Sequence, residues 1–172
     1  MRNVLPGHEG VATAEDLPNI RMEGSLVDYN GNGDMKEGIA AEIEGLRDSL
    51  YAGMQAYATE VAGTPIGYDS HAYPYFFIDG DGDGEISAEE AIYPNAFNAW
   101  TPRLAKAAYN YQVSLKDPGN FAHGGKYTIQ LMYDSLADLN MALAEPIDMS
   151  AMSRIDHGPL CWFRRSVPSL GW

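Results

Sequence analysis

The run DGDGDGEIS, residues 79–87, is the feature that most constrains how this chain can fold. It places aspartates at positions 79, 81 and 83, each followed by a glycine. Carboxylates held this close repel one another unless a cation offsets their charge. The alternative is a solvated acidic turn without an ion. The crowding favours a loop that closes around a cation.

These residues fit the twelve-residue frame of an EF-hand calcium loop. Asp79, Asp81 and Asp83 take positions one, three and five, and Gly84 makes the sharp turn at six. Every expected ligand is a hard oxygen, as Ca²⁺ requires, whereas the small octahedral shell of Mg²⁺ tolerates a bidentate glutamate poorly. With the backbone carbonyl at position seven and the acid at twelve, we predict Ca²⁺ bound by Asp79, Asp81, Asp83, Glu85 and Glu90.

An earlier segment, DYNGNGDMKEG at residues 28–38, repeats the pattern in variant form. Its twelfth position is Ile39, so a substitute acid is needed, either Glu37 at position ten or Glu42 on the first helical turn. The alternative is an Asn-Gly turn that only caps a helix. We predict a second Ca²⁺ site formed by Asp28, Asn30, Asn32, Asp34 and Glu37.

The spacing of the two loops argues against a signalling pair. They begin at residues 28 and 79, and Pro74 stands before the second loop where an EF-hand would have a helix. We therefore expect no calmodulin-type pair that opens a groove. Calcium is expected to be structural, fixing where helices begin and adding its binding free energy to folding.

Apolar residues at steps of three and four predict a mainly α fold with little or no sheet. One stripe runs from Glu37 to about Val61, and another follows a hydroxyl cap and helix-starting proline at Thr101 and Pro102 and ends at Asp117. A third stripe is Ile129, Met132, Leu136 and Leu139, and it runs out near Pro146.

We expect three regions along the chain: an extended lead-in over residues 1–27, a helical calcium-binding domain over residues 28–157, and a tail over residues 158–172. The tail GPLCWFRRSVPSLGW suits neither helix nor strand. Codons can be chosen for these residues such that removing one nucleotide gives another readable sequence, so we hypothesise a frameshift and expect the tail to pack poorly. "MRNVLPGHEG" lacks the pattern of an export signal.

Composition excludes several classes of function. Twenty-four acids against eleven Lys plus Arg give a net charge of -13, which repels nucleic acid and suits divalent cations. No apolar run is long enough to span a membrane. The single cysteine, Cys161, leaves no disulfide and no CxxCH pair, so haem c is not attachable to this chain.

The four histidines form no catalytic or zinc pattern. They lie at 8, 71, 123 and 157, without HExxH spacing and without a GxSxG serine motif elsewhere. Taken by themselves, they are expected to be surface or hydrogen-bonded histidines. The chain is accordingly predicted not to be an enzyme.

Two longer stretches nevertheless carry a family resemblance. YDSHAYPYFFIDGDGDGEISAEEAIYPNAFNAWTPRLAKAAYNYQ and KDPGNFAHGGKYTIQLMYDSLADL resemble the region between haem-binding segments of bacterial multihaem c-type cytochromes, and LPNIRMEGSLVDYNGNGDMKEGIAAEIEGLRDSLY resembles the stretch before it. The resemblance implies that His123, after a DPG turn, is an axial ligand of a haem held elsewhere, with His71 as a second candidate. Gly124 stands where the family usually has asparagine.

These observations together predict a haem-free fragment of an exported multihaem cytochrome. Its parent would transfer electrons, or act as an oxidoreductase, in the periplasm or outside the cell. The expected partners are calcium ions and the haem-bearing segments of the parent or a redox partner, without nucleic acid and without a membrane span. The alternative is a free-standing, dockerin-like calcium-dependent interaction module.

Overall fold

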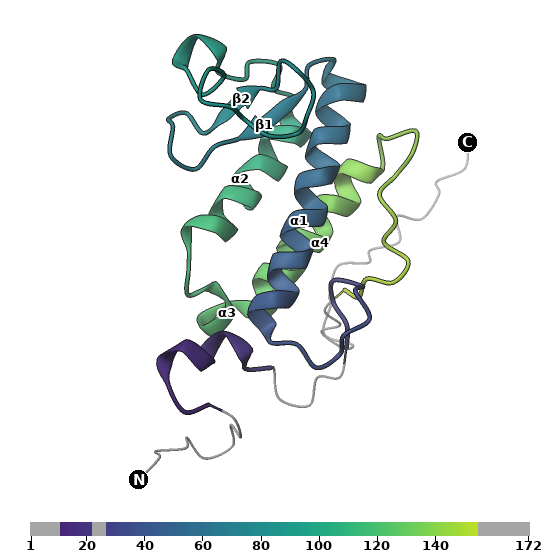
Figure 1. Ribbon diagram of the computed structural model, residues 1–172. Coiled ribbons are helices and arrows are strands. Elements are labelled where there is room, and N and C mark those ends of the chain that lie inside the picture. Colours follow the sequence, from purple (N-terminus) through teal and green to yellow (C-terminus); the bar gives the residue numbers. More distant parts are fainter. Residues whose placement is uncertain (1–10, 22–26, 155–172) are drawn as a thin grey trace, which may run out of the picture.

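Three long helices dominate the computed structural model, which describes residues 11–21 and 27–154. They are α1 (Ile39–Tyr57), α2 (Pro102–Lys116) and α4 (Gly125–Asn140), with the single turn α3 (Asn120–His123) between the last two. Each long helix packs against the other two, and α1 lies along α4 (Figure 1). The prediction of a mainly α fold is confirmed.

Helix α1 supplies the central stripe of the core. The buried residues recur at helical spacing and are Ile39, Ile43, Leu46, Leu50, Met54 and Tyr57. A Cβ at Gly53 would stand only 2.6 Å from Leu136 Cδ1, so glycine lets α1 approach α4 closely. The helix begins two residues later than the predicted Glu37, and it continues as a π-turn over Ala58–Ala62.

The other two long helices start and end as local chemistry dictates. Thr101 Oγ accepts a hydrogen bond from Leu104 N at 3.2 Å, which confirms the predicted cap of α2. Helix α4 ends at Asn140, earlier than the break expected near Pro146. Beyond this end the Asn140 side chain holds the returning chain, because it donates to Ile147 O at 2.9 Å and accepts from Ile147 N at 3.0 Å.

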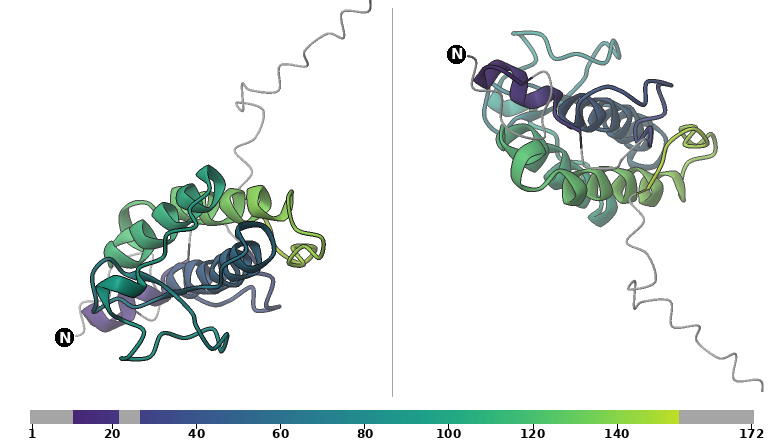
Figure 2. Two further views of the ribbon diagram at one scale, coloured as in Figure 1. Left: turned by 90° about the horizontal axis from the view of Figure 1, so that it is seen from above. Right: turned by 90° about the horizontal axis from the view of Figure 1, so that it is seen from below.

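A two-stranded antiparallel sheet covers one end of the helices. Strands β1 (Ile66–Tyr68) and β2 (Phe76–Ile78) pair with Ile66 opposite Ile78, and Phe77 is fully buried. Figure 1 shows the sheet and its loops at one end of α1 and the N-terminal 3-10 helix at the other, and Figure 2 looks at the helices from above and from below. Strand β2 leads directly into the loop that begins at Asp79.

The lead-in docks on the start of α1. Within the segment expected to be extended, Ala14–Asn19 form a short 3-10 helix, and Ile39 N then donates to Ile20 O at 2.9 Å. Arg21 follows, and its guanidinium donates to the backbone carbonyls of Glu37 and Val27. One side chain thus joins the lead-in to both ends of the segment before α1.

Arg21 also forms an ion pair with a fully buried carboxylate, that of Glu42. Glu42 Oε1 lies 3.1 Å from Arg21 Nη2, while Glu42 Oε2 accepts from Tyr29 N at 2.9 Å and Asn30 N at 3.1 Å. Burial raises the pKa of Glu42, although these hydrogen bonds oppose the shift. The ion pair and the two amides together offset the cost of burying this charge.

Some predicted features cannot be compared with the structure. The tail of residues 158–172, with its expected frameshift and poor packing, lies outside the described residues, as do His8 and His157. Among the described helices, none combines the length and apolar character that crossing a bilayer requires. The division into three regions stays a prediction.

Replacing Arg21 with methionine should leave the Glu42 charge buried without its cation. We expect Arg21→Met to lower the free energy of unfolding by about 3 kcal/mol at neutral pH. Because the folded-state pKa of Glu42 is raised, its protonation favours the folded state, so the loss should shrink as the pH falls through that pKa. Urea unfolding between neutral and mildly acidic pH measures this.

The control is Arg154→Met, which removes an arginine from the exposed pair with Asp134. An exposed pair contributes about 0–1 kcal/mol, so this variant should change stability little and without the same pH dependence. Equal losses for the two variants would contradict the role given to Arg21.

Candidate metal-binding loops

The two aspartate loops fold with the same backbone pattern around their first residue. In the second loop, Asp79 accepts from Gly82 N at 2.8 Å and from Gly84 N at 2.9 Å, one bond to each carboxylate oxygen. In the first, Asp28 accepts in the same way from the amides three and five residues later, both at 2.6 Å. A shared pattern in segments this far apart in sequence indicates a shared loop type.

The repeat extends along positions three, five and seven. Each position-three side chain accepts from the amide of position five, at 3.3 Å in the second loop and 3.0 Å in the first. Each position-five side chain accepts from the amide of position seven, at 2.9 Å and 2.7 Å. The residues concerned are Asp81, Asp83 and Glu85 in one loop and Asn30, Asn32 and Asp34 in the other.

Glycines at positions four and six make this winding possible. Gly31 and Gly33 have φ of 81° and 90°, and Gly82 and Gly84 have φ of 75° and 89°. These are left-handed conformations in which a side chain is strained. The alternation of glycine with acidic or amide residues therefore follows from the loop geometry.

The second loop gathers three carboxylates in one place. Oxygens of Asp79, Asp81 and Asp83 lie within 4.8 Å of one another, and Asp79 is buried while the other two are exposed. These hard donors, all anionic, fit a divalent cation of the Ca²⁺ or Mg²⁺ type. The cluster is the arrangement on which the metal prediction for this loop depends.

Glu90, the acid at position twelve, closes the loop without joining that cluster. Its Oε1 accepts from Gly80 N at 2.6 Å, and its Oε2 accepts from Ser87 N at 3.0 Å and Ser87 Oγ at 2.9 Å. Hydrogen bonds from Ser87 and Gly80 lower the pKa of this carboxyl. The side chain therefore stays ionised and links positions two, nine and twelve.

In the first loop, Glu37 and Glu42 are the two candidate substitutes for the acid at position twelve, and the structure places them in different surroundings. Glu37 Oε1 accepts from Asn30 Nδ2 at 2.7 Å and from Asn32 Nδ2 at 3.0 Å, which places its carboxylate beside positions three and five. Glu42 instead lies buried against Arg21 and the loop backbone. Glu37 thus lies beside the side chains at positions three and five, whereas Glu42 binds the backbone amides at positions two and three.

The second loop does not sit between two helices. Strand β2 precedes it, and turns with the 3-10 helix Tyr93–Asn95 follow it, so the expectation that it fixes a helix start is wrong for this loop. Asn95 Nδ2 donates to Ile78 O at 2.8 Å and Glu90 O at 3.0 Å, joining the loop's two ends. The first loop does lead into α1.

Helix α1 holds the loops apart. The first loop leads into α1 at Ile39. The second loop is bonded near the other end of α1, where Gln55 Nε2 donates to Gly84 O at 2.7 Å. At 1.5 Å per residue these points are about 24 Å apart along the axis. This agrees with the expectation that the loops do not pair. Sequence reasoning missed Gln55 because nothing local marks a contact 29 residues away.

The two candidate haem ligands are exposed and far apart in sequence. His71 is 94% exposed, with Nδ1 3.4 Å from Asp69 Oδ1. His123 ends α3, is 67% exposed, and has Nε2 3.1 Å from Asp117 Oδ1. Neither contacts the aspartate loops through a described bond, and the structure does not test either as a haem ligand.

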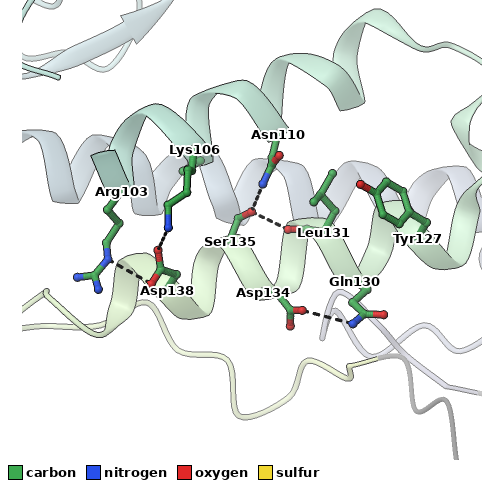
Figure 3. A pocket seen from close by; sticks show the side chains of 10 residues that line it. Arg103, Lys106, Asn110, Tyr127, Gln130, Leu131, Asp134, Ser135 and Asp138 are labelled. Carbon is green, nitrogen blue, oxygen red and sulfur yellow. Dashed lines mark hydrogen bonds and ion pairs between the residues drawn. The ribbon is translucent and has the colours of Figure 1, made fainter. Parts of the chain in front are cut away.

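A charged groove of about 350 Å³ lies between α2 and α4. Arg103 and Lys106 both approach Asp138, at 3.2 and 3.6 Å, and Asn110 donates to Ser135 Oγ at 2.8 Å (Figure 3). The polar groups of the groove mainly satisfy one another, so it serves to join the two helices. The sequence analysis did not anticipate it.

Part of the chain is similar in sequence to curated proteins. The chain is 31% identical over 108 residues to the C-type polyheme cytochrome OmcC of Geobacter sulfurreducens, covering 58% of this chain and 13% of that protein. Two OmcB cytochromes of the same species are 30% identical over the same length, and the chain covers 14% of each. The chain is related to polyhaem cytochromes.

The similarity covers very different shares of this chain and of its relatives. The match takes in a small part of each relative, whereas more than half of this chain is covered. All three names are those of cytochromes rather than of classical enzymes, in line with the prediction that this chain is not an enzyme. No family model and no solved structure matches the chain.

The glycines at position six give a matched test of the loop geometry. Both Gly33→Ala and Gly84→Ala should lower the free energy of unfolding by about 1–2 kcal/mol, because each forces a side chain to positive φ. The loss should be larger at Gly84, where a Cβ would lie 3.3 Å from Gln55 Nε2, than at Gly33, where no atom lies within 4 Å. Urea unfolding of both variants measures the order.

Proposed function

We propose that this chain is a calcium-stabilised helical unit of the multihaem cytochrome type that carries no covalent haem of its own. The three-aspartate cluster, within a hydrogen-bond pattern repeated in two loops, is the observation that carries the calcium part. The likeness to polyhaem cytochromes supports the cytochrome part. Electron transfer would be the activity of the haem-bearing protein to which such a unit belongs.

The residues proposed to hold calcium divide between the two loops. The stronger site has three aspartates and Glu90, with the backbone carbonyl of Glu85, and the weaker site has fewer anionic side chains. Ligand charge is one of the factors that tune calcium affinity. The second set comprises Asp28, Asn30, Asn32, Asp34 and Glu37. Bound calcium would offset the repulsion between the carboxylates and so stabilise the fold.

The haem part of the proposal concerns imidazole ligands. One cysteine cannot form the CxxCH attachment of a c-type haem, so any haem would belong to another segment or chain. His123 projects from a short helix at the surface and is therefore accessible to such a partner. His71 is the second proposed ligand.

Calcium loops of this kind also suggest a compartment. Structural sites fill where calcium is abundant, which favours the periplasm or the cell exterior. A dockerin-like interaction module has less support, because the loops differ in ligand set and stand at opposite ends of α1.

The calcium proposal predicts that a change at Glu90, but not at the adjacent Glu89, removes the stabilisation by calcium. Calcium at a hundred times its dissociation constant stabilises a protein by about 2.7 kcal/mol, which is visible as a rise in melting temperature. Glu90→Gln should remove most of that rise, whereas Glu89→Gln, the same change at position eleven, which supplies no ligand, should retain it. Thermal melts with calcium and with chelator measure both.

A wild-type melting temperature that is the same in calcium and in chelator would contradict the proposal. So would an equal calcium response in the two variants, because the effect would then not come from the loop.

The haem proposal can be tested with a ferric c-type haem peptide that carries one histidine ligand and leaves the other axial position open. Binding of a second imidazole should convert the iron to the low-spin form and shift its Soret band. His123→Ala should weaken this binding at least about tenfold, and His71→Ala should weaken it less. An unchanged titration for both variants would contradict these ligand assignments.

A further inference from the structure

The outer side of the second loop is bonded to α1 through one peptide group. Gln55 Nε2 donates to Gly84 O at 2.7 Å, and the Tyr51 hydroxyl lies 3.4 Å from the same oxygen. Tyr51 is itself held, since its hydroxyl accepts from Tyr68 N of β1 at 2.9 Å. The carbonyl of position six is therefore bonded to α1 and not to another residue of the loop among its described bonds.

The other edge of that peptide group points into the loop. A trans peptide directs its C=O and its N–H to opposite sides. With Gly84 O bonded outward to Gln55, the Glu85 N–H faces inward, and it donates to Asp83 Oδ1 at 2.9 Å. One carboxylate oxygen of Asp83 is thereby fixed, and its orientation depends on a bond made outside the loop.

The same peptide adjoins the expected backbone ligand. The orientation of the Gly84–Glu85 peptide fixes the backbone on the N-terminal side of Glu85. The Glu85 carbonyl is the expected ligand at position seven of the calcium loop. Gln55 also lines the cavity of about 590 Å³ that Asp79 and Asp83 line, so it stands beside the carboxylates it orients.

We infer that Gln55 is the positioning residue of the second loop: by holding the Gly84 carbonyl it presets Asp83 and the Glu85 carbonyl for a divalent cation. This inference rests on the proposed calcium function. Gln55 itself binds no ion and lies in a partly buried position on α1. Helix α1 thus supports the second loop from outside.

The test compares Gln55→Met with Gln130→Met, both in an Asp28→Ala background that disables the first loop. Methionine keeps the length of glutamine and lacks the donor, and Gln130 donates to Asp134 on the same helix α4, away from the second loop. The probes are Ca²⁺ by titration calorimetry and Tb³⁺ by tyrosine-sensitised luminescence. Lifetimes in H₂O and D₂O count the waters bound to Tb³⁺.

Gln55→Met should weaken Ca²⁺ binding roughly fivefold, the effect of one lost hydrogen bond. It should also raise the number of Tb³⁺-bound waters by about one as the position-seven carbonyl is replaced. Gln130→Met should change neither quantity. A merely structural role for Gln55 would lower stability in chelator without changing the water count.

The possible failures are distinguishable. Binding and hydration that are unchanged in Gln55→Met would overturn the inference and leave the calcium function standing. A parent protein that binds neither Ca²⁺ nor Tb³⁺ would overturn the proposed function itself, and the inference with it. Equal weakening in both methionine variants would also count against the role of Gln55.

Discussion

Helix α1 is the support on which both aspartate loops depend. Loops rich in glycine and acid bury little apolar surface, so they cannot order themselves through hydrophobic contact. Their backbone groups instead bond to side chains of one helix, Glu42 in its first turns and Gln55 toward its end. The apolar stripe of α1 against α4 makes that helix rigid enough to serve two attachments.

Several acidic groups near the loops have compensating partners. Glu42 has Arg21 and two backbone amides, Glu90 has Ser87 and Gly80, and the first aspartate of each loop has two amides. Asp81 and Asp83, which are exposed, each accept a single described backbone amide. In a chain of net charge -13, that difference favours cation binding at the second loop.

The sequence predicts what depends on local pattern. The three helical stripes, the Thr101 cap and the glycine positions of both loops follow from periodicity, capping and φ constraints within a few residues. The contacts made by Arg21, Gln55 and Asn95 join segments that folding alone brings together, so no spacing rule reveals them. The burial of Glu42 and its bonds to the first loop are likewise not predictable from local spacing. The metal and haem ligands remain predictions.

The turn that follows the second loop has a consequence for how any bound ion would act. In a sensor protein the exit helix works as a lever, swinging when the last ligand engages. Here the exit chain has no α-helix, and Asn95 fastens it to both Ile78 and Glu90. Ion binding at this loop would therefore move no exit helix. It would stabilise the fold and would not transmit a conformational change to a distant surface.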